Sequence, residues 1–337
     1  MQEFVVGTPL KHSVASQPYS FAGGISIQKV SPILWDISIA KRYISQHDRD
    51  YLSEDRFWLC AKAETQSEHD AGAQQLYEKA RQAAYALQII APCGGRNVYL
   101  QFRNTGKGFD NVGACHPHEA CVTLLGKLLC AEKLGLAGDF DRVYGGVRRA
   151  FTEKVVRIQN PILLLEHAQQ IGNIPLAATM CSMGLDMLFM AGKINPFVSR
   201  LGGFLGLDTF VFPSYGFDGE PPHQPAVRVK EVLADVYAFR NIVAHGHEIP
   251  TTWCQPQELL TTEGHSVNYE PICRVDLMLE SSLFLLTKAL RAIFTEDLFE
   301  DVADTSKWRA KLRVYEHRYK DSGGAEISDK YGGSPDL

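Results

Sequence analysis

The stretch Leu233 to Pro250, LADVYAFRNIVAHGHEIP, contains side chains that could act on a phosphodiester. His245 carries an imidazole, whose unperturbed pKa of about 6.5 lets it take or give a proton at neutral pH. Arg240 carries a guanidinium, which can hold a phosphate by two hydrogen bonds and stabilise the charge that develops on it. The pair suits phosphodiester chemistry, in which His245 moves the proton of a ribose 2′-hydroxyl or of the leaving oxygen and Arg240 holds the scissile phosphate.

The helix that must position these groups is predicted over residues 226–245. Its core-facing stripe recurs at helical spacing and consists of Val229, Val232, Val236, Phe239 and Val243. Gly246 suits the left-handed conformation that follows a helix, so His245 is expected on the last turn or the cap. Arg240 and His245 lie about 140° apart around an ideal helix. Their convergence therefore depends on the cap or on a partner molecule.

A structural role for the same residues is the alternative interpretation. A histidine near a helix C-terminus interacts favourably with the helix dipole, and an arginine can pair with a structural carboxylate. In the functional interpretation Asn241 orients Arg240, His245 or the substrate and completes the candidate catalytic set. The candidate substrate-binding residues are Tyr237, His247, Arg148 and Arg149.

The first part of the chain predicts a mixed α+β domain over residues 1–115, of unknown role. Alternating or aromatic and β-branched residues predict strands over 3–6, 21–30, 33–39, 56–63 and 98–102. Residues 40–54 are polar and predict a short helix or loop, and residues 68–90 predict a helix that ends at a Pro-Cys-Gly-Gly cluster. Residues 104–113 predict a Gly-rich loop.

Helical patterns replace the strands from about Pro117 onward and predict an all-α domain over residues 116–302. The predicted helices are 118–134, 140–157, 160–170, 175–192, 196–205, 226–245 and 272–302, with a long loop over 210–225. A basic helix is predicted over 303–320, and the Gly/Ser/Asp-rich tail 321–337 is predicted to be disordered. The fold class is therefore α+β, with a helical bundle after a mixed domain.

The segment Val236 to Gly246, VYAFRNIVAHG, resembles the signature of the HEPN superfamily (higher eukaryotes and prokaryotes nucleotide-binding). There a late helix carries Arg, a polar residue, a few further residues and then His, often followed by Gly. The helix before it resembles the superfamily's earlier core helix, with Gly184 to Phe189 matching a Gly/Ala-Leu-Asp/Glu-x-Leu-Phe pattern. The order of the helices agrees over roughly 140–301, under half of the chain, and the Apea-like members are the most similar in character.

This resemblance implies a helical bundle that dimerises along the motif helix and places two Arg/His sets in one cleft. It implies metal-independent cleavage of RNA with a 2′,3′-cyclic phosphate product, in a prokaryotic defence or toxin context. Other members of the superfamily have lost activity, so a non-catalytic interaction or dimerisation module and a nucleotide-binding regulator remain the alternatives. The expected partners are RNA and a second copy of the chain.

Composition excludes a bulk polycationic nucleic-acid binder, because 34 Lys and Arg against 39 Asp and Glu give a formal net charge of −5. Any phosphate-binding surface must be local. Besides the Arg240/His245 helix end, the candidates are the basic residues of 142–157 and of 306–320, where Trp308, Tyr315 and Tyr319 are interleaved. The alternative for both is a solvated helix face with its aromatic side chains packed beneath.

A cytoplasmic protein with reduced thiols is expected from the eight scattered cysteines and from a start that lacks the features of a secretory signal. Neither of the two most apolar stretches predicts a membrane span, because both contain charged residues. No metal or other cofactor is expected. The clusters Cys115 to Cys121 and His245-Gly246-His247 lack the spacing of a complete metal site, and Arg103 to Gly108 lacks the spacing of a phosphate-binding loop. Met180, Met183, Met187 and Met190 predict a packed core or a dimer seam.

Overall fold

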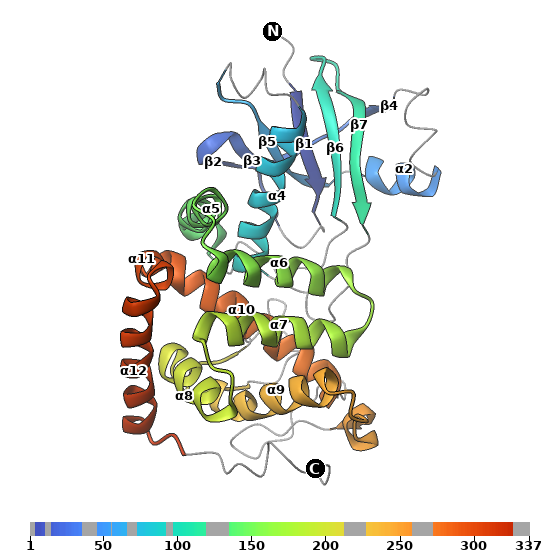
Figure 1. Ribbon diagram of the computed structural model, residues 1–337. Helices are drawn as coiled ribbons and strands as arrows, with labels where there is room; N and C mark the ends of the chain where they lie inside the picture. The colour runs from blue at the N-terminus through green and yellow to red at the C-terminus, as the bar shows by residue number, and fades with distance from the viewer. Residues whose placement is uncertain are drawn as a thin grey trace. The chain divides into compact units, whose positions relative to one another are not determined.

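The computed structural model describes residues 4–10, 15–35, 46–54, 56–65, 73–91, 97–118, 135–211, 227–257 and 272–325. They belong to two compact units, residues 1–149 and 150–337 (Figure 1). The architecture is α+β with a helical C-terminal region, as predicted. The predicted boundary at residue 115 falls inside a strand, Phe109–His118, and the division between the units comes later, after Arg149.

The first unit is built on a seven-stranded sheet in the order β2-β3-β5-β1-β6-β7-β4. Every neighbouring pair is antiparallel except β4 and β7, which run parallel. The strands are β1 (Phe4–Pro9), β2 (Tyr19–Phe21), β3 (Ile25–Lys29), β4 (Ile33–Trp35), β5 (Phe57–Lys62), β6 (Asn97–Asn104) and β7 (Phe109–His118). A single 3-10 turn, η1 (Ala22–Gly24), joins β2 to β3.

The first unit also contains three helices, α2 (Gln46–Ser53), α4 (Ala73–Ile90) and most of α5 (Leu136–Thr152), among its described residues. Helix α4 packs against β1, β5 and β6, and its predicted apolar side is buried, including Leu76, Ala80 and Leu87. Trp58, Leu100 and other buried side chains of the sheet form a core cluster that includes Leu52 from α2. Burial of apolar area against the sheet is the main stabilising contribution here.

The predicted Gly-rich loop over 104–113 is mostly a β-hairpin. Strand β7 begins at Phe109, and the turn closes with a 3.0 Å hydrogen bond from the Thr105 N–H to the Gly108 carbonyl. Gly106 and Gly108 both have positive φ, a conformation that glycine adopts at low cost. The turn leads into a strand rather than a helix. The predicted helix 118–134 does not begin at His118, because β7 continues to that residue; residues 119–134 lie outside the described residues.

The second unit is helical. Its helices are α6 (Val156–Gln170), α7 (Ile174–Phe189), α8 (Ile194–Leu205), α9 (Val229–Ala244), α10 (Arg274–Thr295), α11 (Phe299–Ala303) and α12 (Thr305–Asp321). A one-turn helix η3 (Thr251–Cys254) and a short pair of strands, β8 (Pro256–Gln257) and β9 (Ile272–Cys273), lie between α9 and α10. Most of the predicted loop 210–225 and most of the tail lie outside the described residues.

The core of this unit forms where α7 packs against α6, α9 and α10. Gly184 permits the close approach, because a Cβ at that position would lie 3.1 Å from a methyl carbon of Leu286 on α10 and 3.5 Å from the Cα of Pro161 on α6. Pro161 itself lies inside α6, although the predicted helix began at residue 160. Helix α6 starts one turn earlier, at Val156.

Two predicted helices are each divided by a residue in the left-handed conformation. The predicted helix 140–157 ends at Thr152, and Lys154 with φ 55° separates it from α6. The predicted helix 272–302 ends at Thr295, and Asp297 with φ 54° separates α10 from α11. Neither residue is a glycine, so neither break carries the usual sequence signal.

Among the described residues, no single helix is long and apolar enough to cross a bilayer. Only α7 and α8 taken together reach that length and composition, and a bend of 79° separates them.

Substitution of Gly203 tests the packing of α8 against α12. A Cβ at this position would lie 1.9 Å from the main-chain carbonyl oxygen of Tyr315, so the two helices must separate. We expect Gly203→Ala to lower the free energy of unfolding by roughly 1–3 kcal/mol, measured by urea denaturation of the full chain. Gly172→Ala is the control, since its Cβ would meet nothing within 4 Å. Equal stability of both variants would contradict the observed contact.

Candidate functional site

The end of α9 has the geometry predicted for it. His245 is the C-cap residue, and Gly246 follows with φ 69°. The N–H of Gly246 donates to the carbonyl of Val243 over 3.1 Å, and the N–H of His247 donates to the carbonyl of Ile242 over 2.9 Å. These two hydrogen bonds form a Schellman motif, which satisfies the last carbonyls of the helix and directs the chain away from it.

Arg240, one turn before the cap, is held by an ion pair to Asp186 on α7. Its Nη2 donates to the Asp186 Oδ2 over 2.9 Å, and its Nη1 donates to the Oδ1 of neighbouring Asn241 over 3.0 Å. The Arg240 and Asp186 side chains are only 22% and 16% exposed. A charge-assisted hydrogen bond between partly buried groups is stronger than a surface ion pair. The guanidinium is therefore fixed in place by α7.

Asp186 also closes the end of its own helix. Its Oδ1 accepts a 2.7 Å hydrogen bond from the N–H of Gly192, and its main-chain carbonyl accepts one from Met190. Met190 adopts a left-handed conformation with φ 50°, and Arg200 on α8 donates to its carbonyl over 2.6 Å. One carboxylate thus joins α9, α7 and the turn after α7.

The ring of Tyr237 packs against the guanidinium of Arg240. The Arg240 guanidinium carbon lies 5.3 Å from the centre of the Tyr237 ring, within the range of a cation–π interaction. The ring also packs against Phe197 on α8, with 5.1 Å between ring centres. Burial raises the pKa of the Tyr237 hydroxyl. Tyr237 is therefore buried beside Arg240 and Phe197, and its assignment to substrate binding remains a prediction.

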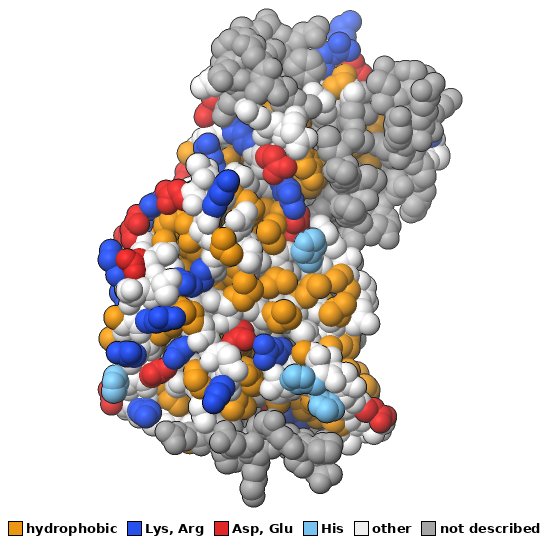
Figure 2. All heavy atoms as spheres, in the orientation of Figure 1, with side chains coloured by type: hydrophobic (Ala, Val, Ile, Leu, Met, Phe, Trp, Pro, Cys, Tyr) orange, Lys and Arg blue, Asp and Glu red, His pale blue; other side chains and the backbone are white. Residues whose placement is uncertain are grey.

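His245 and His247 are both exposed and lie beside each other, with ring centres 6.1 Å apart. Histidine side chains gather over α9 on the face shown in Figure 2. Within the described part of the chain, hydrogen bonds and ion pairs connect Arg240 to Asp186 and Asn241, and none connects it to His245. The structure brings Arg240, Asn241 and Tyr237 together, and it pairs the two histidines separately.

Arg148 and Arg149 lie on α5, in the first unit, whereas α9 belongs to the second. The exposed Arg148 stacks on the ring of Tyr144, with its guanidinium carbon 5.7 Å from the ring centre. Their assignment to substrate binding remains a prediction.

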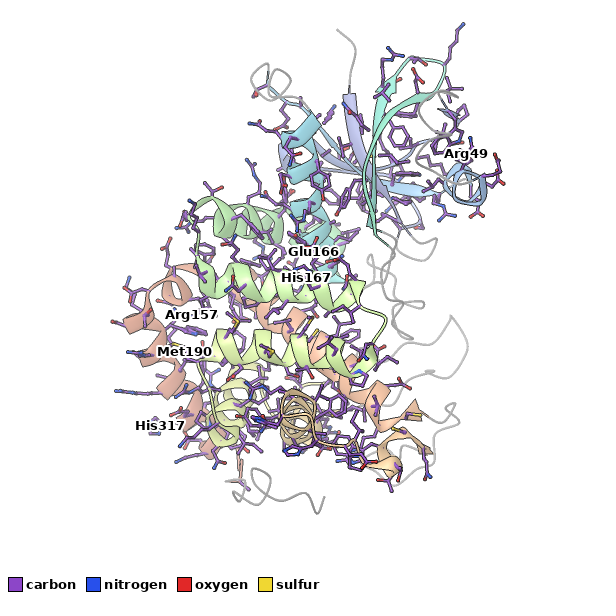
Figure 3. The ribbon with its side chains drawn as sticks, turned by 45° about the vertical axis from the view of Figure 1, so that its right-hand side comes forward. Arg49, Arg157, Glu166, His167, Met190 and His317 are labelled. Atoms are coloured by element: carbon purple, nitrogen blue, oxygen red, sulfur yellow. The ribbon has the colours of Figure 1, made fainter. Side chains whose placement is uncertain are left out.

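The remaining basic stretches are partly engaged in packing. Arg157 connects the start of α6 to α11 and α12, because it donates to the Val302 carbonyl over 2.6 Å and to the Thr305 hydroxyl over 2.8 Å (Figure 3). On α12, Trp308 is fully buried, and its indole N–H donates to the Leu188 carbonyl over 2.6 Å. Tyr315 and Tyr319 are buried as well. The alternative interpretation, aromatic side chains packed beneath a solvated basic face, is therefore the one that the structure supports for α12.

The described ranges contain no group of three or more His, Cys, Asp or Glu side chains that could hold a metal ion. His245 and His247 have no third ligand among the described residues. The side chains of Cys115 to Cys121 lie outside the described part of the structure.

Sequence reasoning missed the partner of Arg240. Asp186 lies in one of the most apolar stretches of the chain, where an isolated carboxylate requires compensation. That signal was available, but it does not identify which cation compensates it. A second cluster was also missed, in which Arg274 pairs with Asp235 of α9 over 2.6 Å and stacks on Trp253 at 4.1 Å.

Comparison with known proteins found no family model, no curated protein and no solved structure that matches the chain.

A double-mutant cycle measures how strongly Asp186 holds Arg240. Asp186→Asn keeps an acceptor for the Gly192 N–H but removes the charge, and Arg240→Gln removes the cation. We expect a coupling free energy of roughly 0.5–1.5 kcal/mol in urea denaturation, because the pair is partly buried and hydrogen-bonded. The i,i+3 pair Asp139–Arg142 on α5, in which the Arg142 side chain is 57% exposed, is the control and should give a smaller value. Additive effects at positions 186 and 240 would show that the ion pair contributes nothing.

Proposed function

We propose that the chain is a metal-independent endoribonuclease that cleaves RNA by attack of the ribose 2′-hydroxyl, with Arg240, Asn241 and His245 as its catalytic residues. The observation that carries the proposal is the fixed guanidinium of Arg240, held by Asp186 and Asn241 one turn before two exposed histidines. We place this activity in the cytoplasm, in a prokaryotic defence or toxin context.

The resemblance to the HEPN superfamily supports this proposal in one further respect. It rests on two separate segments, Gly184 to Phe189 and Val236 to Gly246. The ion pair between Asp186 and Arg240 joins these two segments in the folded chain. Residues that were selected only by their sequence pattern therefore contact each other, which an accidental match of two short motifs would not require.

The geometry suits different catalytic roles for His245 and Arg240. His245 lies in solvent at the helix end, where it can reach a 2′-hydroxyl or a leaving 5′-oxygen and move the proton. Asp186 and Asn241 each accept one hydrogen bond from the guanidinium, which has five N–H donors. Its remaining Nη hydrogens are those that can donate to a phosphate oxygen. A guanidinium that is already oriented loses little entropy when it binds one.

A homodimer is part of the proposal, since within one copy the hydrogen bonds and the ion pair of Arg240 go to Asp186 and Asn241 rather than to His245. Helix α7 packs against α9 and exposes an apolar stripe of Leu176, Met183 and Met187. Figure 2 shows apolar side chains spread over this part of the helical unit. Apolar side chains that gather on a surface are typical of protein–protein contacts. Pairing through this face brings the ends of two α9 helices together, so the His245 of one copy can approach the Arg240 of the other.

RNA cleavage by purified variants in the presence of EDTA tests the catalytic assignment. We expect His245→Ala and Arg240→Ala to lower the rate by roughly 10²–10⁴-fold, because they remove proton transfer and charge stabilisation respectively. His317→Ala and Arg313→Ala on α12 are matched controls, since both residues are exposed. Figure 3 shows His317 on α12, away from α9. Controls that lose as much activity as the two test variants would refute the assignment.

A non-catalytic interaction module is the second candidate function. The observation that favours it is again the ion pair. Asp186 neutralises the positive charge with which Arg240 would bind a phosphate, and the pair gives Arg240 a structural role. In that case α7 and α9 form a binding seam, and no RNA is cleaved by the wild-type chain.

Light scattering of the full chain tests the seam that both candidates share. We expect Met183→Glu and Met187→Glu to convert a dimer into a monomer, because each introduces a charge into an apolar contact. Val314→Glu on α12 is the control, since Val314 is also exposed but lies on another helix. A dimer that survives both α7 substitutions places the contact elsewhere, and a monomeric wild type refutes it.

A further inference from the structure

We propose that Cys254 and Cys273 form a reversible disulfide that closes a clamp on α9, and that the chain is oxidised and reduced at this pair. The proposal does not depend on RNA cleavage. Cys254 ends η3, and Cys273 ends β9, immediately before α10. The segment 255–272 separates them in the sequence.

The short strands bring the two cysteines together. Pro256 faces Cys273 in the antiparallel ladder of β8 and β9, two residues after Cys254. The Cys273 thiol reaches the main chain of Cys254 itself and donates to its carbonyl oxygen, with 3.1 Å between sulfur and oxygen. A disulfide requires Cα atoms within about 7 Å of each other. Closing the bond requires the Cys254 sulfur to turn toward the Cys273 sulfur, which already lies against the main chain of Cys254.

These two thiols differ from the other cysteines that the structure describes. Cys60 and Cys181 are buried, and burial raises the pKa of each thiol to about 12, so they stay protonated and unreactive. Cys254 is exposed and Cys273 is half-buried. Burial and the nearby Asp276 raise the pKa of the Cys273 thiol. Cys254 is therefore the thiol that an oxidant meets first, and Cys273 is the thiol that completes the bond.

The neighbours of the pair connect it to α9. Trp253, next to Cys254, stacks on Phe239 of α9 with ring centres 5.6 Å apart. Arg274, next to Cys273, pairs with Asp235 of α9 over 2.6 Å and lies 4.1 Å from the centre of the Trp253 ring. Asp235 and Phe239 are four residues apart and share one face of the helix. A bond between Cys254 and Cys273 would fasten the two halves of this clamp covalently.

The oxidant is a small-molecule disulfide such as oxidised glutathione. The Cys254 thiolate attacks one glutathione sulfur, forms a mixed disulfide and releases one glutathione thiolate. The Cys273 thiolate then attacks the Cys254 sulfur, which forms the intramolecular bond and releases the second glutathione. Two protein thiols lose two protons and two electrons, and one oxidised glutathione becomes two reduced molecules. An excess of reduced glutathione or of dithiothreitol reverses both steps.

Mass spectrometry of the folded full-length protein tests the proposal directly. The wild type is incubated with oxidised glutathione, its remaining thiols are alkylated, and its peptides are mapped without reduction. We expect a peptide that joins Cys254 to Cys273, with Cys60 and Cys181 alkylated only after unfolding, and loss of the joined peptide after dithiothreitol. In Cys273→Ser we expect Cys254 to retain one glutathione.

A melting experiment supplies a second readout. Oxidation should raise the melting temperature of the wild type by about 5 °C or more, because a disulfide constrains the unfolded chain. Cys254→Ser should show no rise. The proposal is overturned if both cysteines stay open to alkylation, if each carries its own glutathione, or if either joins a different cysteine. An equal rise in Cys254→Ser would also contradict it.

Discussion

The ion pair between Asp186 and Arg240 is the interaction on which the rest of the site depends. A carboxylate in a helix as apolar as α7 must find a cation or hydrogen-bond donors, because leaving it uncompensated is costly. Arg240 supplies the cation, and the N–H of Gly192 supplies a donor. These two bonds hold α9 against α7, close the turn that follows α7 and orient the Arg240 guanidinium. One turn later the Schellman motif ends α9, and His245 and His247 are exposed there.

Helix positions could be predicted because their apolar residues recur with the period of a helix, and packing against neighbouring helices rewards that pattern. The end of α9 was predictable as well, since Gly246 is suited to the left-handed conformation it adopts. The breaks at Lys154 and Asp297 were not, because neither residue is a glycine and so neither carries that signal. The start of β7 lies in the predicted loop 104–113, because Gly106 and Gly108 form the turn before it and the polar Asp110 and Asn111 follow its first residue.

The candidate site was predictable only along one helix. Arg240, Asn241 and Tyr237 are close in sequence and remain close in the fold, as helical spacing requires. Asp186 lies on another helix, so its role depended on tertiary packing that no local pattern specifies. The net charge also did not indicate where on the chain a phosphate-binding surface lies. It showed that a phosphate-binding surface must be local, but Arg157 proved to be a packing residue that connects helices.

In the proposed reaction, the end of α9 promotes attack by the 2′-hydroxyl of the RNA on the adjacent phosphate, without a metal. Analysis of the ends that the wild-type protein leaves on a single-stranded RNA in EDTA tests this most directly. We expect a 2′,3′-cyclic phosphate on one fragment and a 5′-hydroxyl on the other, because the 2′-oxygen displaces the 5′-oxygen. Fragments with a 3′-hydroxyl and a 5′-phosphate, or an intact RNA, would contradict it.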